Sequence, residues 1–149
     1  MIDTIALKLY IEPKPLKRAR HSKQGSFIRT YYDKDTLQEM DTLKYAIINA
    51  LTEQDRQVIV YHMENAHKRL LIALKLTFGF VIPKSYSMKR RKQLKDQPCT
   101  SKGDIDNLCK NVLDRGNGIL WSDDRYIYSL EAKKTYAEAN YIKIDITYI

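Results

Sequence analysis

Residues 68–82, KRLLIALKLTFGFVI, form a segment in which apolar side chains recur at every second position. The recurring positions are Leu70, Ile72, Leu74, Leu76, Phe78 and Phe80. A period of two puts these side chains on one face of an extended strand, and Pro83 cannot continue the pairing of that strand. The pattern therefore predicts a long strand that ends before Pro83, and we expect it at the centre of a sheet.

Three further segments are predicted to be strands. In residues 4–11 and 141–149, isoleucine and leucine alternate with other side chains, as they do in strands with one buried face. Residues 125–134 form the third strand. Only a short loop containing alanine and asparagine separates it from residues 141–149, so we expect these two strands to form a hairpin. Residues 27–32, FIRTYY, are a short strand or the edge of a loop.

Two segments have the spacing of amphipathic helices. In residues 34–52, apolar side chains recur at helical spacing after an aspartate that can cap the helix, either Asp33 or Asp35. Residues 104–115 show the same periodicity over a shorter length. Residues 53–67 are polar, and their structure is ambiguous.

Two basic stretches separate these elements, and we expect both to be irregular. They cover residues 12–27 and 84–102. The order of the predicted elements is therefore β-α-β-α-β-β. We expect an α+β fold, a small mixed β-sheet with helices packed on it, in a single domain over residues 1–149.

The composition narrows the class of protein. With 149 residues, the chain is long enough to bury a core without disulfides. Its two cysteines, Cys99 and Cys109, are too few for a disulfide scaffold or a zinc-finger array. No apolar run approaches the ~20 residues of a membrane span, and the N-terminus has the pattern of a strand rather than a signal peptide. We therefore expect an intracellular, reduced protein with no membrane partner, and the net charge of +8 suggests an anionic partner.

Acidic side chains follow directly after the second basic stretch. Asp104 and Asp106 stand where the second helix begins. After that helix, a turn at Asn117-Gly118 precedes Asp123 and Asp124. Crowded carboxylates repel one another unless a cation lies among them, and Mg²⁺ prefers oxygen ligands. If the chain folds back at the turn, the two pairs of acids lie together and form a metal site.

A lysine extends this acidic cluster. Lys110 lies four residues after Asp106, and therefore on the same face of the helix one turn further on. Asp114 continues that face. A lysine beside carboxylates and a metal can stabilise the charge that develops on a phosphate, or orient a water. Together with the basic stretches, these residues suit metal-assisted hydrolysis of a phosphodiester.

Each of these residues also has a purely structural explanation. Asp104 can be a helix N-cap, and Asp106 with Lys110 can be an ordinary surface pair. Asp123-Asp124 can belong to a solvated turn, and the basic run 89–92 to a solvated loop.

A resemblance to a known family is carried by the stretch KGDIDNLCKNVLDRGNGILWSDDRYIYSLEAKKTY. It resembles the signature of the RusA family of Holliday-junction resolvases: D-x-D-N-x-x-K, V-L-D, a turn with glycine, a hydrophobic pair, D-D, and a strand that ends in basic residues. The matching residues are Asp104, Asp106, Asn107, Lys110, Asp114, Gly118, Trp121, Asp123, Asp124, Lys133 and Lys134. The N-terminal third is similar to the family more loosely, through PKPLKRAR and the Tyr31-Tyr32 pair.

The resemblance implies a homodimeric, Mg²⁺-dependent endodeoxyribonuclease, with Mn²⁺ as a substitute metal. Such an enzyme binds four-way DNA junctions and nicks two strands symmetrically in recombination and repair. By match, Asp104, Asp106 and Asp124 are catalytic, metal-binding carboxylates, and Lys110 is the catalytic lysine. Asp123 is a supporting acid or a further metal ligand. The residues expected to contact DNA phosphates are Lys14, Lys17, Arg18, Arg20, Lys23, Lys89, Arg90, Arg91 and Lys92. The implied location is the cytoplasm of a bacterial host, with a phage or prophage as the source of the gene.

Three other functions fit parts of the same sequence. The same active-site residues would serve a nuclease that acts on flaps or other branched replication intermediates, and only a panel of substrates separates this enzyme from a resolvase. A non-catalytic basic DNA-binding protein would bind junctions without Mg²⁺-dependent nicking. An interaction protein without a nucleic-acid role would not bind DNA even at ~50 mM salt, where phosphate contacts are strongest.

Overall fold

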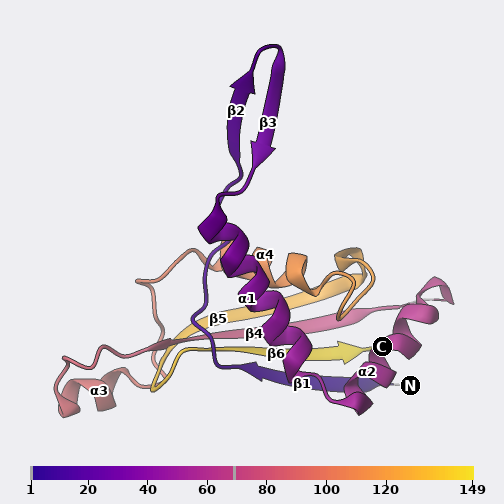
Figure 1. Cartoon of the computed structure of the whole chain (residues 1–149). Helices are drawn as coiled ribbons and strands as arrows, with labels where there is room; N and C mark the ends of the chain where they lie inside the picture. Colours follow the sequence, from indigo (N-terminus) through magenta and orange to yellow (C-terminus); the bar gives the residue numbers. More distant parts are fainter. Residues whose placement is uncertain (1, 69) are drawn as a thin grey trace.

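A four-stranded mixed sheet organises the chain (Figure 1). The computed structural model describes residues 2–68 and 70–149. The strands of the sheet are β1 (Asp3–Leu9), β4 (Ile72–Val81), β5 (Ile127–Ala137) and β6 (Tyr141–Tyr148). Their order is β1-β6-β4-β5, in which β4 and β5 run parallel and the other neighbours run antiparallel. Two further strands, β2 (Arg20–Gln24) and β3 (Phe27–Tyr31), form a separate antiparallel hairpin.

Four α-helices and two short 3-10 helices accompany the strands in the part of the chain that the structure describes. They are α1 (Lys34–Ala50), α2 (Glu53–Glu64), η1 (Ala66–Lys68), α3 (Met88–Leu94), α4 (Ile105–Gly116) and η2 (Asp124–Tyr126). Helices α1 and α4 contact each other on one face of the sheet (Figure 1). The α+β fold with a mixed sheet is therefore confirmed. Across residues 2–68 and 70–149, no helix is both long enough and apolar enough to cross a membrane.

The long strand predicted from its alternating pattern lies in the interior of the sheet. β4 has β6 on one side and β5 on the other. Its side chains at Leu74, Leu76 and Phe78 are buried, whereas Lys75 between them is exposed. The central position expected for the strand is confirmed, but the alternation holds only in its first half, because residues 76–80 are buried at every position.

The predicted hairpin of the last two strands is wrong. β5 and β6 do not pair with each other, because β4 lies between them. The linking residues 138–140 pass over the end of β4, where the Val81 N–H donates to Asn140 Oδ1 at 2.9 Å and the Ile82 N–H donates to the Ala137 carbonyl at 2.9 Å. A short link therefore joins strands that are two positions apart. The arrangement buries the most apolar strand between two neighbours.

The basic stretches are less irregular than their composition suggested. The first stretch contains β2, and the second contains α3. Ser87 caps α3, because its side chain accepts a hydrogen bond from the Arg90 N–H. The ambiguous polar segment is helix α2, which begins with a reciprocal capping box between Thr52 and Asp55. These elements depend on caps and turns at their ends rather than on apolar periodicity.

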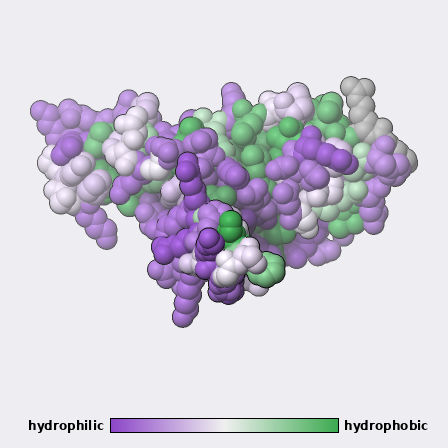
Figure 2. Space-filling view, turned by 90° about the horizontal axis from the view of Figure 1, so that it is seen from above, coloured by the Kyte–Doolittle hydropathy of each residue, from purple (hydrophilic) through white to green (hydrophobic). Residues whose placement is uncertain are grey.

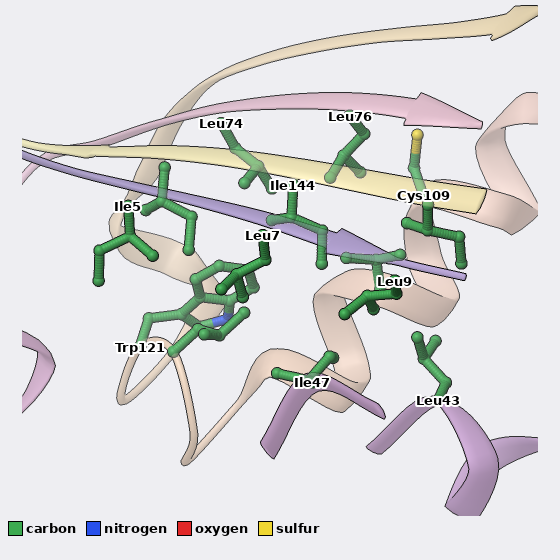
Figure 3. Close-up of a cluster of buried hydrophobic side chains, with 14 of the residues drawn as sticks. Ile5, Leu7, Leu9, Leu43, Ile47, Leu74, Leu76, Cys109, Trp121 and Ile144 are labelled. Atoms are coloured by element: carbon green, nitrogen blue, oxygen red, sulfur yellow. The ribbon is translucent and has the colours of Figure 1, made fainter. Parts of the chain in front are cut away.

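The core lies between one face of the sheet and helices α1 and α4. Figure 3 shows Leu43 and Ile47 of α1 and Cys109 of α4 pointing toward the side chains of the sheet. The labelled sheet residues are Ile5, Leu7, Leu9, Leu74, Leu76 and Ile144. Because α4 is fixed by this contact, the side chains on its other face have a defined position on the surface.

The turn after α4 is attached to the sheet by one buried hydrogen bond. The Tyr148 hydroxyl at the end of β6 donates to the Leu120 carbonyl at 2.7 Å. Burial, and then the charge of Asp55, raise the pKa of Tyr148 above its ordinary value, so the hydroxyl stays protonated. This bond holds the segment that leads to Asp123 and Asp124 against the sheet.

We expect Tyr148→Phe to lower the free energy of unfolding by about 1–3 kcal/mol, because the buried Leu120 carbonyl loses its donor. Urea denaturation followed by circular dichroism measures the change. Tyr128→Phe is the matched control, because Tyr128 is exposed and should change stability little. An equal loss in the two variants would contradict the role given to the hydrogen bond.

Candidate active site and nucleic-acid interface

The start of helix α4 presents two free carboxylates. Asp104 occupies the N-cap position by its backbone, but its side chain makes no capping hydrogen bond. Asp106 stands in the first turn, and both side chains are exposed. The opposite face of α4 is buried through Leu108 and Val112, among others. The simple capping explanation of Asp104 therefore fails, since this carboxylate does not bond to its own helix.

Two lysines of β5 lie beside the acids at this end of α4. A shallow hollow is lined by Asp104 and Asp106 together with Lys133 and Lys134 of β5. Lys134 Nζ donates to the Gly103 carbonyl at 2.6 Å, which ties the strand to the start of the helix. Acids and cations thus share one open surface.

The negative charge of Asp106 reaches the core side of the helix. Burial, and secondarily the charge of Asp106, raise the pKa of the Cys109 thiol above its ordinary value. This buried thiol therefore stays protonated at neutral pH, and it lies on the buried face of the helix rather than beside the exposed carboxylates. Oxygen atoms are the donors that this surface offers.

Lys110 faces a second hollow next to the acids. This hollow is lined by Lys110 and Asn107 of α4, by Tyr32 after β3 and, from the first basic stretch, by Leu16, Lys17, Arg18, Ala19 and His21. Lys110 is exposed. Lys110 therefore lines one hollow together with Lys17 and Arg18 of the first basic stretch.

The segment between β1 and β2 is bonded directly to α4. The Leu16 N–H donates to the Asn107 carbonyl at 3.3 Å, and the buried Asn111 side chain donates to the Lys14 carbonyl at 3.1 Å. These bonds place the segment across the outer side of α4. Some of its cations have acidic partners: Lys14 lies 3.4 Å from Glu12, and Lys17 lies 3.5 Å from Glu39.

Asp123 and Asp124 lie after the turn at the other end of α4. The chain reverses tightly there, because Gly116 leaves room for Trp121; a Cβ on Gly116 would lie 2.4 Å from the indole. Asp123 Oδ1 accepts from the Arg125 N–H at 2.9 Å and caps η2, and η2 contacts α4. Within residues 2–68 and 70–149, no three His, Cys, Asp or Glu side chains are grouped closely enough to hold a metal ion. In the described residues of the single chain, Asp104 and Asp106 therefore do not form the expected metal-binding cluster with Asp123 and Asp124.

The second group of predicted DNA-binding cations lies on α3 and away from the hairpin (Figure 1). Lys89, Arg90 and Lys92 are exposed, and Arg91 is partly buried. The Arg90 guanidinium lies 3.6 Å from the centre of the Tyr86 ring, a cation–π contact that orders this side chain. The two cationic groups therefore occupy separate parts of the surface.

Sequence reasoning missed a pair of exposed apolar residues on the β2-β3 hairpin. Phe27 and Ile28 follow the two-residue loop Gly25-Ser26. A two-residue Gly-Ser loop between short strands is itself a hairpin signal, and it was hidden by the basic composition of the region.

Two carboxylates without structural partners, a nearby lysine and two cationic surfaces define a class of protein. They fit enzymes that hydrolyse the phosphodiester backbone of nucleic acids. Comparison with protein families identifies the particular class: the model described as Endodeoxyribonuclease RusA matches residues 11–147. The chain belongs to this family of nucleases, which confirms the resemblance noted in the sequence.

A curated relative agrees with the family. The chain is 42% identical over 77 residues to the "Crossover junction endodeoxyribonuclease rusA" of Lactococcus phage r1t. The matched region covers 51% of this chain and 55% of the relative, so the chain spans about half the length of that protein.

The stability of two variants, one at Asp104 and one at the helix cap Thr52, tests whether the Asp104 carboxylate has a structural role. We expect Asp104→Ala to change the free energy of unfolding by less than ~0.5 kcal/mol, because its side chain makes no capping bond. Thr52→Ala, which removes the capping box of α2, should cost about 1 kcal/mol. Chemical denaturation of both variants makes the comparison. A loss for Asp104→Ala as large as that for Thr52→Ala would assign Asp104 a structural role.

Proposed function

We propose that this protein is a Mg²⁺-dependent, structure-specific endodeoxyribonuclease that resolves four-way DNA junctions by paired symmetric nicks. The observation that carries the proposal is the pair Asp104 and Asp106 at the start of α4, exposed and without a cap bond, on a chain of net charge +8. A protein that only bound DNA would gain nothing from free carboxylates turned toward phosphates. A nuclease needs them.

Asp104, Asp106 and Asp124 are the carboxylates that would hold the metal, with Asp123 as a supporting acid or a further ligand. Their hard oxygen atoms fit Mg²⁺, and Mn²⁺ would replace it. When bound, the metal neutralises charge on the scissile phosphate and lowers the pKa of an attacking water. Because the described residues of the single chain do not bring the two acidic pairs together, the proposal includes a movement of the segment that carries Asp123 and Asp124 toward the fixed start of α4 when DNA is bound.

Lys110 would act from the second hollow. Its ammonium group, one turn after Asp106, would stabilise the negative charge that develops on the phosphate oxygens. Asn107, on the same hollow, would orient the phosphate through its amide. Both side chains keep their positions because α4 is fixed to the sheet on one side and to Leu16 and Lys14 on the other.

The cationic surfaces would bind the DNA backbone. Near α4 and the hairpin they comprise Lys14, Lys17, Arg18, Arg20 and Lys23, and on α3 they comprise Lys89, Arg90, Arg91 and Lys92. Phosphate contacts give affinity that falls steeply with salt. A homodimer would present two such sites related by a twofold axis, which matches two symmetric nicks in one junction. The substrate would be branched DNA in the cytoplasm of a bacterial host that carries the gene on a phage or prophage.

Asp106→Asn is expected to slow Mg²⁺-dependent nicking of a synthetic four-way junction at least ~100-fold, because a lost metal ligand removes several kcal/mol of transition-state stabilisation. Binding in EDTA should be unchanged or tighter, because a negative charge beside the phosphates is gone. Gel assays of nicking and binding measure both quantities. Asp41→Asn, which removes an exposed carboxylate from α1, is the matched control and should behave as wild type.

Two results would overturn the proposal. Full nicking activity in Asp106→Asn with intact binding would exclude the metal role of this carboxylate. Junction binding by the wild type without cleavage under any divalent metal would leave a DNA-binding protein. A linear duplex and a flap, run beside the junction, decide which branched substrate is preferred.

A further inference from the structure

The hairpin of β2 and β3 stands away from the rest of the chain (Figure 1). Its strands pair in regular register from Arg20–Tyr31 to Gln24–Phe27. Gly25, with φ of +63°, is the first of the two loop residues, as in the tight turns that connect such strands. Five residues at ~3.3 Å each extend the hairpin by about 16 Å.

The end of this hairpin is apolar although the hairpin as a whole is basic. Phe27 is 77% exposed and Ile28 is 72% exposed. Residues 20–31 contain three cations, Arg20, Lys23 and Arg29, and no aspartate or glutamate. Figure 2 looks down onto the hairpin and shows a small green patch at its end, surrounded by purple side chains.

Each face of the hairpin combines an apolar side chain with at least one cation. Side chains alternate along a strand, so Phe27 and Arg29 lie on one face, together with Arg20, the register partner of Tyr31. Ile28 lies on the other face, directly opposite its register partner Lys23. An apolar side chain contacts bases and a cation contacts phosphates, so both faces have the chemistry of a nucleic-acid contact.

Both ends of the hairpin are attached to parts of the chain that contact α4: one end leads into α1, which packs against α4, and the other leads to the segment bonded to α4. β3 leads into α1 through Tyr32 and Asp33. The Arg20 guanidinium lies 3.2 Å from the Asp33 carboxylate. The same carboxylate caps α1, because it accepts a hydrogen bond from the Thr36 N–H. Hydrogen bonding from Thr36, followed by the charges of Arg20 and Lys17, holds the pKa of Asp33 below its usual value, so this pair is charged at neutral pH.

The other end leads to the segment bonded to α4. At the base of the hairpin, His21 and Tyr32 line the same hollow as Lys110 and Asn107. A DNA strand that passes through this hollow would therefore meet the hairpin and the candidate catalytic helix together. The hairpin and the active site would then contact the same DNA molecule.

We propose that Phe27 and Ile28 contact unstacked bases at the branch point of DNA, with Arg20, Lys23 and Arg29 on the neighbouring phosphates. Apolar side chains placed between base steps are a known way in which proteins open or hold a distorted duplex. Bases at a branch point are less well stacked than bases in a duplex, so they are the accessible partner. The inference rests on the proposed function, since it supplies the means by which the nuclease recognises branched substrates.

A second copy of this chain is the competing partner for the hairpin. A second copy has a net charge of +8, so it repels a hairpin that has three cations and no acid. DNA has the complementary charge, and its bases provide the apolar surface as well. The charge therefore favours DNA, and the oligomeric state of the variants tests the alternative.

The first experiment removes the apolar contact and keeps every charge. In Phe27→Ala/Ile28→Ala, we expect binding to a four-way junction to weaken ~10-fold or more, the size associated with losing base stacking. Binding to a linear duplex and the dependence of affinity on salt should stay as in wild type. Tyr45→Ala, which removes an exposed aromatic from α1, is the matched control. Both replaced side chains are exposed, so the fold should be unaffected, as circular dichroism will check.

The second experiment reports the contact directly. Phe27→Trp should keep junction affinity and add an exposed indole to a chain whose own tryptophan, Trp121, is 0% exposed. We expect the junction to quench the new emission through stacking, and the linear duplex to quench it much less. Unchanged junction affinity in the double alanine variant, or no quenching in Phe27→Trp, would overturn the inference. Emission that shifts with protein concentration in the absence of DNA would also overturn it, because the hairpin would then contact a second copy.

These results separate the two proposals. If wild type binds junctions and quenches the indole but never cleaves, the hairpin inference stands and the nuclease proposal fails. If wild type cleaves junctions with Mg²⁺ and the double alanine variant binds and cleaves equally well, the nuclease proposal stands and the hairpin inference fails.

Discussion

Helix α4 is held from both sides, and the candidate site depends on this. Its apolar face packs through Leu108, Cys109 and Val112 into the core against the sheet. Its outer side is bonded to the segment between β1 and β2 through the carbonyl of Asn107 and the side chain of Asn111. Asp104, Asp106 and Lys110 project from a helix that cannot turn or slide without breaking one of these contacts. The same contacts fix the base of the hairpin relative to the acids.

The elements with apolar periodicity were predictable from the sequence. The helix expected at residues 104–115 is α4 (Ile105–Gly116), and the strand expected within residues 68–82 is β4 (Ile72–Val81). Their patterns are local, because burial of one face requires a period of 3.6 or 2. The pairing of β5 with β4 was not predictable in this way. A short link favours a hairpin, and only the burial of β4 on both sides explains why β5 and β6 do not pair.

In the candidate site, too, some features follow from local sequence spacing and others depend on long-range packing. Asp104, Asp106 and Lys110 lie on one helix, so their grouping follows from sequence spacing. The approach of Asp123 and Asp124 depends on the path of the chain after Gly116, where Trp121 fills the space that a glycine leaves. The hairpin escaped prediction because its basic residues suggested a loop, although Gly25-Ser26 marked a two-residue turn. Long-range packing and turn chemistry, rather than composition, decide these features.

The acids at both ends of α4 are proposed to hold one metal site when the enzyme is bound to DNA. Fe²⁺ in place of Mg²⁺, with ascorbate and peroxide, cleaves a protein backbone close to the bound ion and can be used on the complex with a four-way junction. We predict cuts near residues 104–107 and near residues 123–125, both suppressed by excess Mg²⁺ and both lost in Asp106→Asn. Cuts near only one of these two segments, or cuts that persist in Asp106→Asn, would contradict a shared metal site.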